Sequence, residues 1–153
     1  MRRLPFRLEV RKWYHVVWHT CNRRSLFNMP ARRRACEQEL GRLLRSHGWN
    51  VGAVYVAAAR LHVLAQPPVA APREVVTREI KRLAALAARR VGAVSPWSRT
   101  LWDPGGWCAV MANAVSLRVV RRYLSERASA AGAPVMLDLS VHRISRRATG
   151  APP

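Results

Sequence analysis

The stretch from residue 51 to 68, VGAVYVAAARLHVLAQPP, contains two polar side chains whose spacing could support chemistry. Arg60 and His62 are two residues apart in a run of strand-forming residues, so both would project from the same face of a sheet. A guanidinium pairs with phosphate oxygens, and an imidazole can bind a metal ion. The structural alternative is that Arg60 ends a turn and His62 is a hydrogen-bonded histidine of the sheet. The spacing alone leaves both interpretations open.

The charge of the chain favours a polyanionic partner. Its 153 residues include 27 Lys+Arg against 8 Asp+Glu, a formal net charge of +19, and Lys12 and Lys81 are the only lysines. The planar fork of arginine binds phosphate oxygens and stacks on bases. A small domain with this charge repels itself unless a polyanion lies near it. Nucleic acid is therefore the first candidate partner. An anionic membrane surface is weaker, because no amphipathic helix with a bulky aromatic face is evident.

A second group of residues could contact nucleic acid directly. Trp102 and Trp107, with Arg99 nearby, could stack on unpaired bases. Arginines that could follow phosphates are Arg23, Arg24 and the run at 32–34. The alternative is that the tryptophans belong to the core and the arginines form a solvated surface.

The cysteines and apolar runs indicate the compartment. Cys21, Cys36 and Cys108 are odd in number and widely spaced, which argues against a disulfide scaffold or a zinc ribbon. The longest apolar run, residues 51–59, is shorter than the roughly 18 residues that a membrane span requires. No apolar signal core follows the basic N-terminus. We expect a cytoplasmic protein.

Hydrophobic periodicity and turn residues predict the elements that must position these side chains. They are a strand over 11–20, a helix over 31–47, two strands between 51 and 68, a helix over 73–90, a loop over 95–106, a strand over 107–111 and a helix over 117–131. Ser116 is the expected N-cap of the last helix. This order predicts an α+β fold, a ferredoxin-like split βαββαβ antiparallel sheet with an added C-terminal helix. Residues 1–131 would form the domain, and 132–153 a basic, proline-containing tail.

Several segments together resemble the TnpA family of small single-tyrosine HUH transposases, which includes REP-associated relatives. The similar segments are 14–20, 23–27, 48–49, the strand with His62, 80–83, 101–107 and 116–124. The resemblance implies the same split sheet, a homodimer, and cleavage of single-stranded DNA beside hairpins. In the family a tyrosine on the last helix becomes a 5′-phosphotyrosine. Two histidines flanking one apolar residue hold a divalent metal, Mg²⁺ or Mn²⁺, and a glutamine four residues after the tyrosine completes the site.

The resemblance places Tyr123 at the position of the nucleophile and His62 at that of the second histidine. Arg60 stands at the position of the first histidine, Ala59 at that of the usual acidic residue, and Arg127 at that of the glutamine. An arginine offers no lone pair to a metal, so two of three expected ligands are replaced and His62 alone would not hold Mg²⁺ or Mn²⁺ well. Without the resemblance, Tyr123 would read as a core aromatic whose hydroxyl reaches the surface.

Three functions agree with this pattern. In the first, the scaffold binds hairpin or single-stranded DNA without cutting it, and Arg60 and Arg127 hold a phosphate in place of the metal. In the second, the protein is an active transposase, because guanidiniums can stabilise a phosphoryl transition state or because His15 or His19 restores a metal ligand. In the third, the basic surface binds structured RNA. For the first two we expect a cytoplasmic, nucleoid-associated homodimer.

Overall fold

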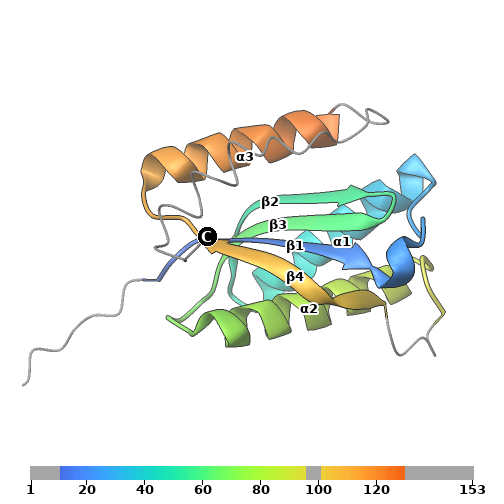
Figure 1. Ribbon diagram of the computed structural model, residues 1–153, viewed down its shortest axis with the longest axis horizontal. Helices are drawn as coiled ribbons and strands as arrows, with labels where there is room; N and C mark the ends of the chain where they lie inside the picture. Colours follow the sequence, from blue (N-terminus) through green and yellow to red (C-terminus); the bar gives the residue numbers. More distant parts are fainter. Residues whose placement is uncertain (1–10, 96–100, 130–153) are drawn as a thin grey trace, which may run out of the picture.

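The computed structural model describes residues 11–95 and 101–129, and it confirms the α+β fold. Its elements are β1 (Tyr14–Thr20), the 3₁₀ turn η1 (Cys21–Arg23), α1 (Pro30–Ser46), β2 (Asn50–Ala57), β3 (Arg60–Gln66), α2 (Arg73–Arg90), β4 (Trp102–Val110) and α3 (Ala114–Ser129). The strands form an antiparallel sheet in the order β2-β3-β1-β4, as the split βαββαβ topology requires. Figure 1 shows α1 and α2 on one face of this sheet and α3 on the other.

The sheet separates two hydrophobic cores. Val16 and Trp18 of β1 pack with Leu44 of α1 and with Ile80 and Leu83 of α2 in the larger core. A smaller core beneath α3 contains Tyr55, Leu64, Ala109, Val120 and Leu124. The alternation of side chains along each strand decides which core each residue joins. The opposite face of β1, which carries His15, therefore lies under α3, where a functional site would be built.

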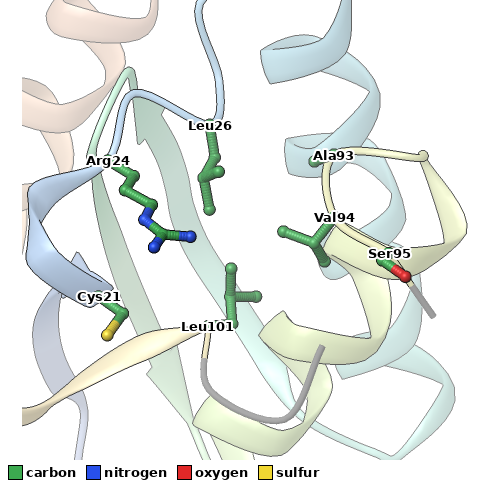
Figure 2. Close-up of a pocket in the computed structure, with 7 residues that line it drawn as sticks. All are labelled: Cys21, Arg24, Leu26, Ala93, Val94, Ser95 and Leu101. Atoms are coloured by element: carbon green, nitrogen blue, oxygen red, sulfur yellow. The ribbon is translucent and has the colours of Figure 1, made fainter. Parts of the chain in front are cut away.

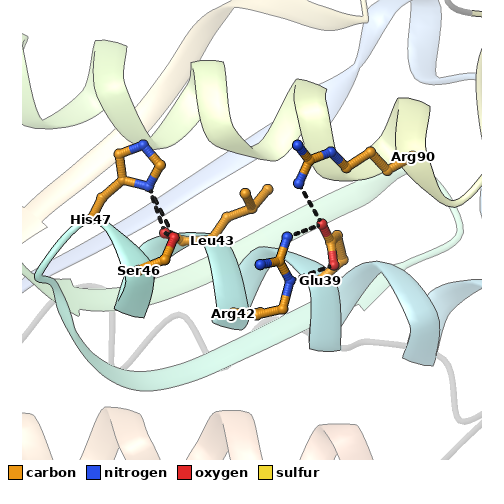
Figure 3. Close-up of polar contacts among 6 residues, drawn as sticks. All are labelled: Glu39, Arg42, Leu43, Ser46, His47 and Arg90. Atoms are coloured by element: carbon orange, nitrogen blue, oxygen red, sulfur yellow. Dashed lines mark hydrogen bonds and ion pairs between the residues drawn. The ribbon is translucent and has the colours of Figure 1, made fainter.

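A carboxylate joins the two helices on the other face of the sheet. Glu39 of α1 forms ion pairs with Arg42, at 2.7 Å, and with Arg90 of α2, at 2.9 Å (Figure 3). At the end of α1, Ser46 Oγ donates a hydrogen bond to Leu43 O at 2.8 Å. The hydrogen bonds from the two arginines lower the pKa of Glu39 to about 2.

This pKa predicts a pH-dependent contribution to stability. Because the folded pKa of Glu39 lies below the unfolded value, its contribution is complete above about pH 4.5 and is lost as the pH falls towards 2. Glu39→Gln should destabilise the fold by about 1 kcal/mol at pH 7, since surface ion pairs are screened by water, and the difference should vanish near pH 2. Urea unfolding at pH 7, 4 and 2 measures this. A difference that stays constant with pH would contradict it. Glu74→Gln, which removes the same charge from an exposed glutamate, is the control.

The predicted loop over 95–106 was wrong at its C-terminal end. β4 begins at Trp102, which pairs with Thr20, and a register shift precedes the pairing of Trp18 with Gly106. Pro104 and Gly105 made this segment look like a loop. A proline is tolerated here because β4 is an edge strand, whose outer N–H groups have no neighbouring strand to bond.

Other boundaries moved by a few residues. Asn113, not Ser116, caps α3: Ser116 N donates to Asn113 Oδ1 at 2.9 Å, the usual contact between the third helical residue and an N-cap. β1 begins at Tyr14 rather than at residue 11. The tail over 132–153 and Arg99 lie outside the described residues. Within the described helices, none combines the length and the apolar character needed to cross a membrane.

Candidate functional site

Arg60 lies where three strands meet at the end of the sheet. It is the first residue of β3 and stands opposite His19 of β1 on one side and Ala57 of β2 on the other. Its side chain is half-buried, and its Nε has no hydrogen-bond partner among the described residues. Burial lowers the pKa of Arg60, and the nearby hydroxyls of Tyr123 and Tyr55 oppose this shift. The guanidinium is thus partly desolvated and lies near two phenols.

Tyr123 and Arg127 approach this guanidinium from α3. They lie one helical turn apart, and the guanidinium carbon of Arg127 lies 5.3 Å from the centre of the Tyr123 ring, within cation–π range. The ring of Tyr123 packs against the smaller core and is half-buried. The ring of Tyr123 is thus packed, as the core interpretation of this residue expects, and the residue also lies close enough to Arg60 to interact with it electrostatically. Its role as nucleophile stays a prediction.

Tyr55 belongs to this cluster and was missed from the sequence. It lies on β2 directly opposite His62, with its ring centre 5.8 Å from that of the imidazole. Burial raises the pKa of Tyr55, while the charges of Arg33, Arg60 and Arg127 lower it. The sequence did hold a signal: a two-residue turn at 58–59 sets Ala57 opposite the residue that follows the turn, which places Tyr55 opposite His62.

The site therefore collects arginines from four elements around two tyrosines. This arginine–tyrosine cluster consists of Arg23 of η1, Arg33 of α1, Arg60 of β3, Arg127 of α3, Tyr55 and Tyr123. The carboxylate of Glu37 also interacts electrostatically with Tyr55, and its oxygen accepts a hydrogen bond from Val56 N at 3.0 Å. Because the charges are mostly positive, the cluster suits an anion with several acceptor oxygens, and phosphate is such an anion.

The histidines separate into two environments. His15 and His62 are fully buried, and His15 Nε2 lies 3.3 Å from His62 Nδ1. Their rings stack with centres 5.5 Å apart, and Trp107 meets His15 edge-on at 5.0 Å. His19 instead is half-buried beside Arg23 and Arg60, and its pKa is lowered first by burial and then by those two charges.

These donors do not fit Mg²⁺ or Mn²⁺. No group of three or more His, Cys, Asp or Glu side chains that could hold a metal ion occurs within residues 11–95 and 101–129. A divalent metal needs lone-pair donors, and an arginine offers none. The two imidazoles that meet, His15 and His62, are directed at each other. The remaining positions around Tyr123 carry Arg60 and Arg127, which repel a cation.

The other predicted arginines lie at the periphery. Arg23 and Arg24 are both exposed, and Arg23 and its neighbour Asn22 adopt left-handed backbone angles, with φ of 51° and 54°. Arg23 interacts electrostatically with Arg60. Arg24 turns away, towards a separate pocket of about 470 Å³ (Figure 2). That pocket is lined by Cys21, Arg24, Leu26, Ala93, Val94, Ser95 and Leu101.

The two tryptophans proposed as base-stacking residues differ in exposure. Trp102 is 5% exposed, and its ring stacks on Phe27 with centres 6.3 Å apart and planes 15° from parallel. It is thus a core residue in this conformation. Trp107 is half-buried, and its edge contact with His15 leaves part of the ring at the surface.

Comparisons with known proteins agree with this fold. The family model described as "Transposase IS200 like" matches residues 10–127, which lie within the expected domain 1–131. A crystal structure of a candidate transposase from Deinococcus radiodurans is similar with a TM-score of 0.53 at 20% identity, over 83% of this chain and 98% of that one. A REP-associated tyrosine transposase bound to a REP hairpin is similar with a TM-score of 0.54 at 16% identity, over 86% of this chain and 74% of that one.

None of the curated proteins compared with this chain matches it. The two structural similarities lie at identities that establish the fold only. The family match spans β1 through most of α3, the elements that carry the arginine–tyrosine cluster and the histidine pair. The chain belongs to the IS200-like transposase family.

Proposed function

We propose that this protein binds hairpin or single-stranded DNA, holds one backbone phosphate at Arg60 and Arg127, and has impaired or lost strand cleavage. The observation that carries the proposal is the position of Arg60, half-buried near Tyr123 and Tyr55, with an Nε that lacks a hydrogen-bond partner among the described residues. A phosphate there would accept from that Nε and from Arg127. The homodimer and the nucleoid-associated location stay predictions.

The charge of the chain supports DNA as the ligand. With a net charge of +19, most of the binding free energy should come from phosphate contacts that release counterions. We expect the logarithm of the affinity to fall steeply and linearly with the logarithm of the salt concentration. The structure of a relative bound to a REP hairpin supports a folded hairpin with single-stranded flanks as the first DNA to test.

The loss of cleavage follows from the chemistry of the phenol. Tyrosine is a weak nucleophile at neutral pH, so its attack on a phosphodiester needs strong stabilisation of the developing charge. In the family a divalent metal supplies this stabilisation, and the donors around Tyr123 do not fit such a metal. Tyr123 would then contact the bound phosphate through its hydroxyl without displacing the 3′ oxygen.

A second candidate is metal-independent cleavage, which the closeness of Arg60 and Arg127 to Tyr123 favours. In this reaction Tyr123 Oη attacks the phosphorus, a 5′-phosphotyrosine bond forms, and the bond to the 3′ oxygen breaks. The proton of the phenol passes to water and the departing oxygen takes one from water. Fixed guanidiniums would stabilise the extra charge on the non-bridging oxygens in the transition state.

Denaturing gels of labelled hairpin DNA distinguish these functions. We expect tight binding on native gels and no protein-linked DNA on denaturing gels with Mg²⁺, Mn²⁺ or EDTA. An adduct that resists EDTA and is absent from Tyr123→Phe would establish metal-independent cleavage instead. An adduct that needs metal would show that the site is rebuilt around an ion and would overturn the proposal. Stronger binding of a structured RNA than of the DNA would favour the RNA function.

A further inference from the structure

We propose that a second DNA-binding site lies in a groove between α2 and β4, on the opposite face of the sheet from α3, and that it takes the phosphodiester backbone of a single strand. This inference rests on the proposed function, because it assumes that DNA is the ligand. The groove has a volume of about 450 Å³. It is lined by Trp18, Arg73, Glu74, Thr77, Arg78, Lys81, Pro104, Gly106, Trp107 and Cys108.

The arginines of this groove differ from Arg82 and Arg90 of the same helix. Arg73 and Arg78 form no ion pair or hydrogen bond with another side chain in the described part of the chain. On the same helix, Arg82 pairs with Glu79 at 2.6 Å and Arg90 pairs with Glu39 at 2.9 Å. Carboxylates of the protein thus pair with Arg82 and Arg90 and leave Arg73 and Arg78 available for an external anion.

The third cation is positioned by the backbone of the edge strand. Lys81 Nζ donates a hydrogen bond to Asp103 O at 3.0 Å, which holds the ammonium beside β4 and leaves its other two protons for a ligand. Glu74 is the single carboxylate among the residues that line the groove, against three cations. The net positive charge favours a phosphate chain over a neutral or cationic ligand.

The shape of the groove suits a backbone rather than bases. A β carbon at Gly106 would lie 2.4 Å from Cδ1 and Nε1 of Trp18, so the absence of a side chain at 106 keeps the wall of the groove open beside that indole. Trp18 is only 3% exposed and cannot offer its face to a base. Trp107 also lines the groove but is half-buried, so the contacts available are mainly charges and polar groups, which hold phosphates without reading sequence.

The position of β4 lets one strand of DNA reach both sites. β4 is an edge of the sheet, with α2 beneath it and α3 on the other face (Figure 1). The arginine–tyrosine cluster lies on the α3 face, and the groove lies on the α2 face. A strand held at the cluster could pass around this edge to enter the groove, so the binding site would be longer than the cluster alone requires.

The test compares two pairs of substitutions that remove the same charge. Arg73→Gln with Arg78→Gln should lower the affinity for a long hairpin DNA by about 10-fold at moderate salt, and should reduce the slope of log affinity against log salt by about 1.4, or 0.7 for each lost contact with a single strand. Arg42→Gln with Arg82→Gln changes two exposed arginines outside the groove and should leave the slope unchanged. Arg78→Glu alone, at an exposed position, repeats the test if the double variant folds poorly.

Hydroxyl-radical footprinting locates the contact. We expect the groove variant to lose protection at one end of the bound strand and to keep it at the phosphate held by the cluster. If the wild type does not bind DNA, the proposed function itself fails. If the wild type binds and Arg60→Gln with Arg127→Gln weakens it, but the groove and control pairs behave alike, only the groove is refuted. A groove variant that weakens RNA binding alone would also overturn the inference.

Discussion

Replacing Arg60 and Arg127 together by glutamine should weaken the binding of a single-stranded hairpin DNA by about 100-fold. Each guanidinium is expected to donate a charge-assisted hydrogen bond to the same phosphate, and such bonds contribute about 1.5 kcal/mol or more each. Two of them amount to about 3 kcal/mol, and 1.4 kcal/mol corresponds to a factor of ten in affinity. The affinity measured by fluorescence anisotropy should not fall when EDTA replaces Mg²⁺, because the proposed contact involves no metal.

The control is chosen to separate a specific contact from a general loss of charge. Arg42→Gln with Arg82→Gln removes two charges from exposed helical positions and should lower the affinity only a few-fold. Lysines at 60 and 127 keep the charge but lose the planar fork, so that variant should bind with intermediate affinity. Thermal unfolding of each variant is needed, because Arg60 is half-buried. If the variant with glutamine at 60 and 127 loses no more affinity for DNA than the control, no phosphate binds at the cluster.

The positions of Arg60 and His62 were predictable because strand geometry is local. Two residues that are two apart on a strand share a face, and that spacing alone placed Arg60 and His62 on one face of the sheet. The structure shows that this is the face covered by α3. The helix over 73–90 was likewise predicted with its observed bounds, since its apolar positions repeat at helical spacing between proline residues and a glycine. Local periodicity needs no knowledge of which elements become neighbours.

The composition of the site was less predictable because it depends on pairing between strands. His15 and His19 share one face of β1, and Val17 between them stands opposite His62, so each is one step diagonal to that imidazole. The sequence could not choose between them. In the structure His15 contacts His62, and His19 stands directly opposite Arg60 in the strand register.

The inclusion of Arg33 and Tyr55 depends on the docking of α1 and α3. Tyr55 lies in an apolar run, and this pattern predicts an ordinary core residue. Only the packing of α3 over β2 brings it near Arg127, and only the packing of α1 against the same strand brings it near Arg33. Residue spacing along the chain does not predict which helices pack against which strand.

The buried histidine pair should behave as a structural element rather than as a metal site. His15→Leu and His62→Leu should each destabilise the fold by about 2 kcal/mol, because each change leaves the partner's buried nitrogen without this hydrogen bond. The double variant removes both polar groups at once. The destabilisation of the double variant should be smaller than the sum of the two single destabilisations by about 1 kcal/mol, as expected for residues in direct contact.

Urea unfolding of the four proteins at pH 8 measures this coupling, since free imidazoles are neutral there. If the losses of unfolding free energy in the two single variants simply add up to the loss in the double variant, the 3.3 Å contact between the two imidazoles contributes nothing. Addition of Mn²⁺ or EDTA tests the metal separately: a ligand that binds only the native state must raise its stability. We expect the wild type to have the same unfolding midpoint with Mn²⁺ as with EDTA. A midpoint that rises with Mn²⁺ in the wild type and not in His62→Leu would instead mean that the pair still holds a metal.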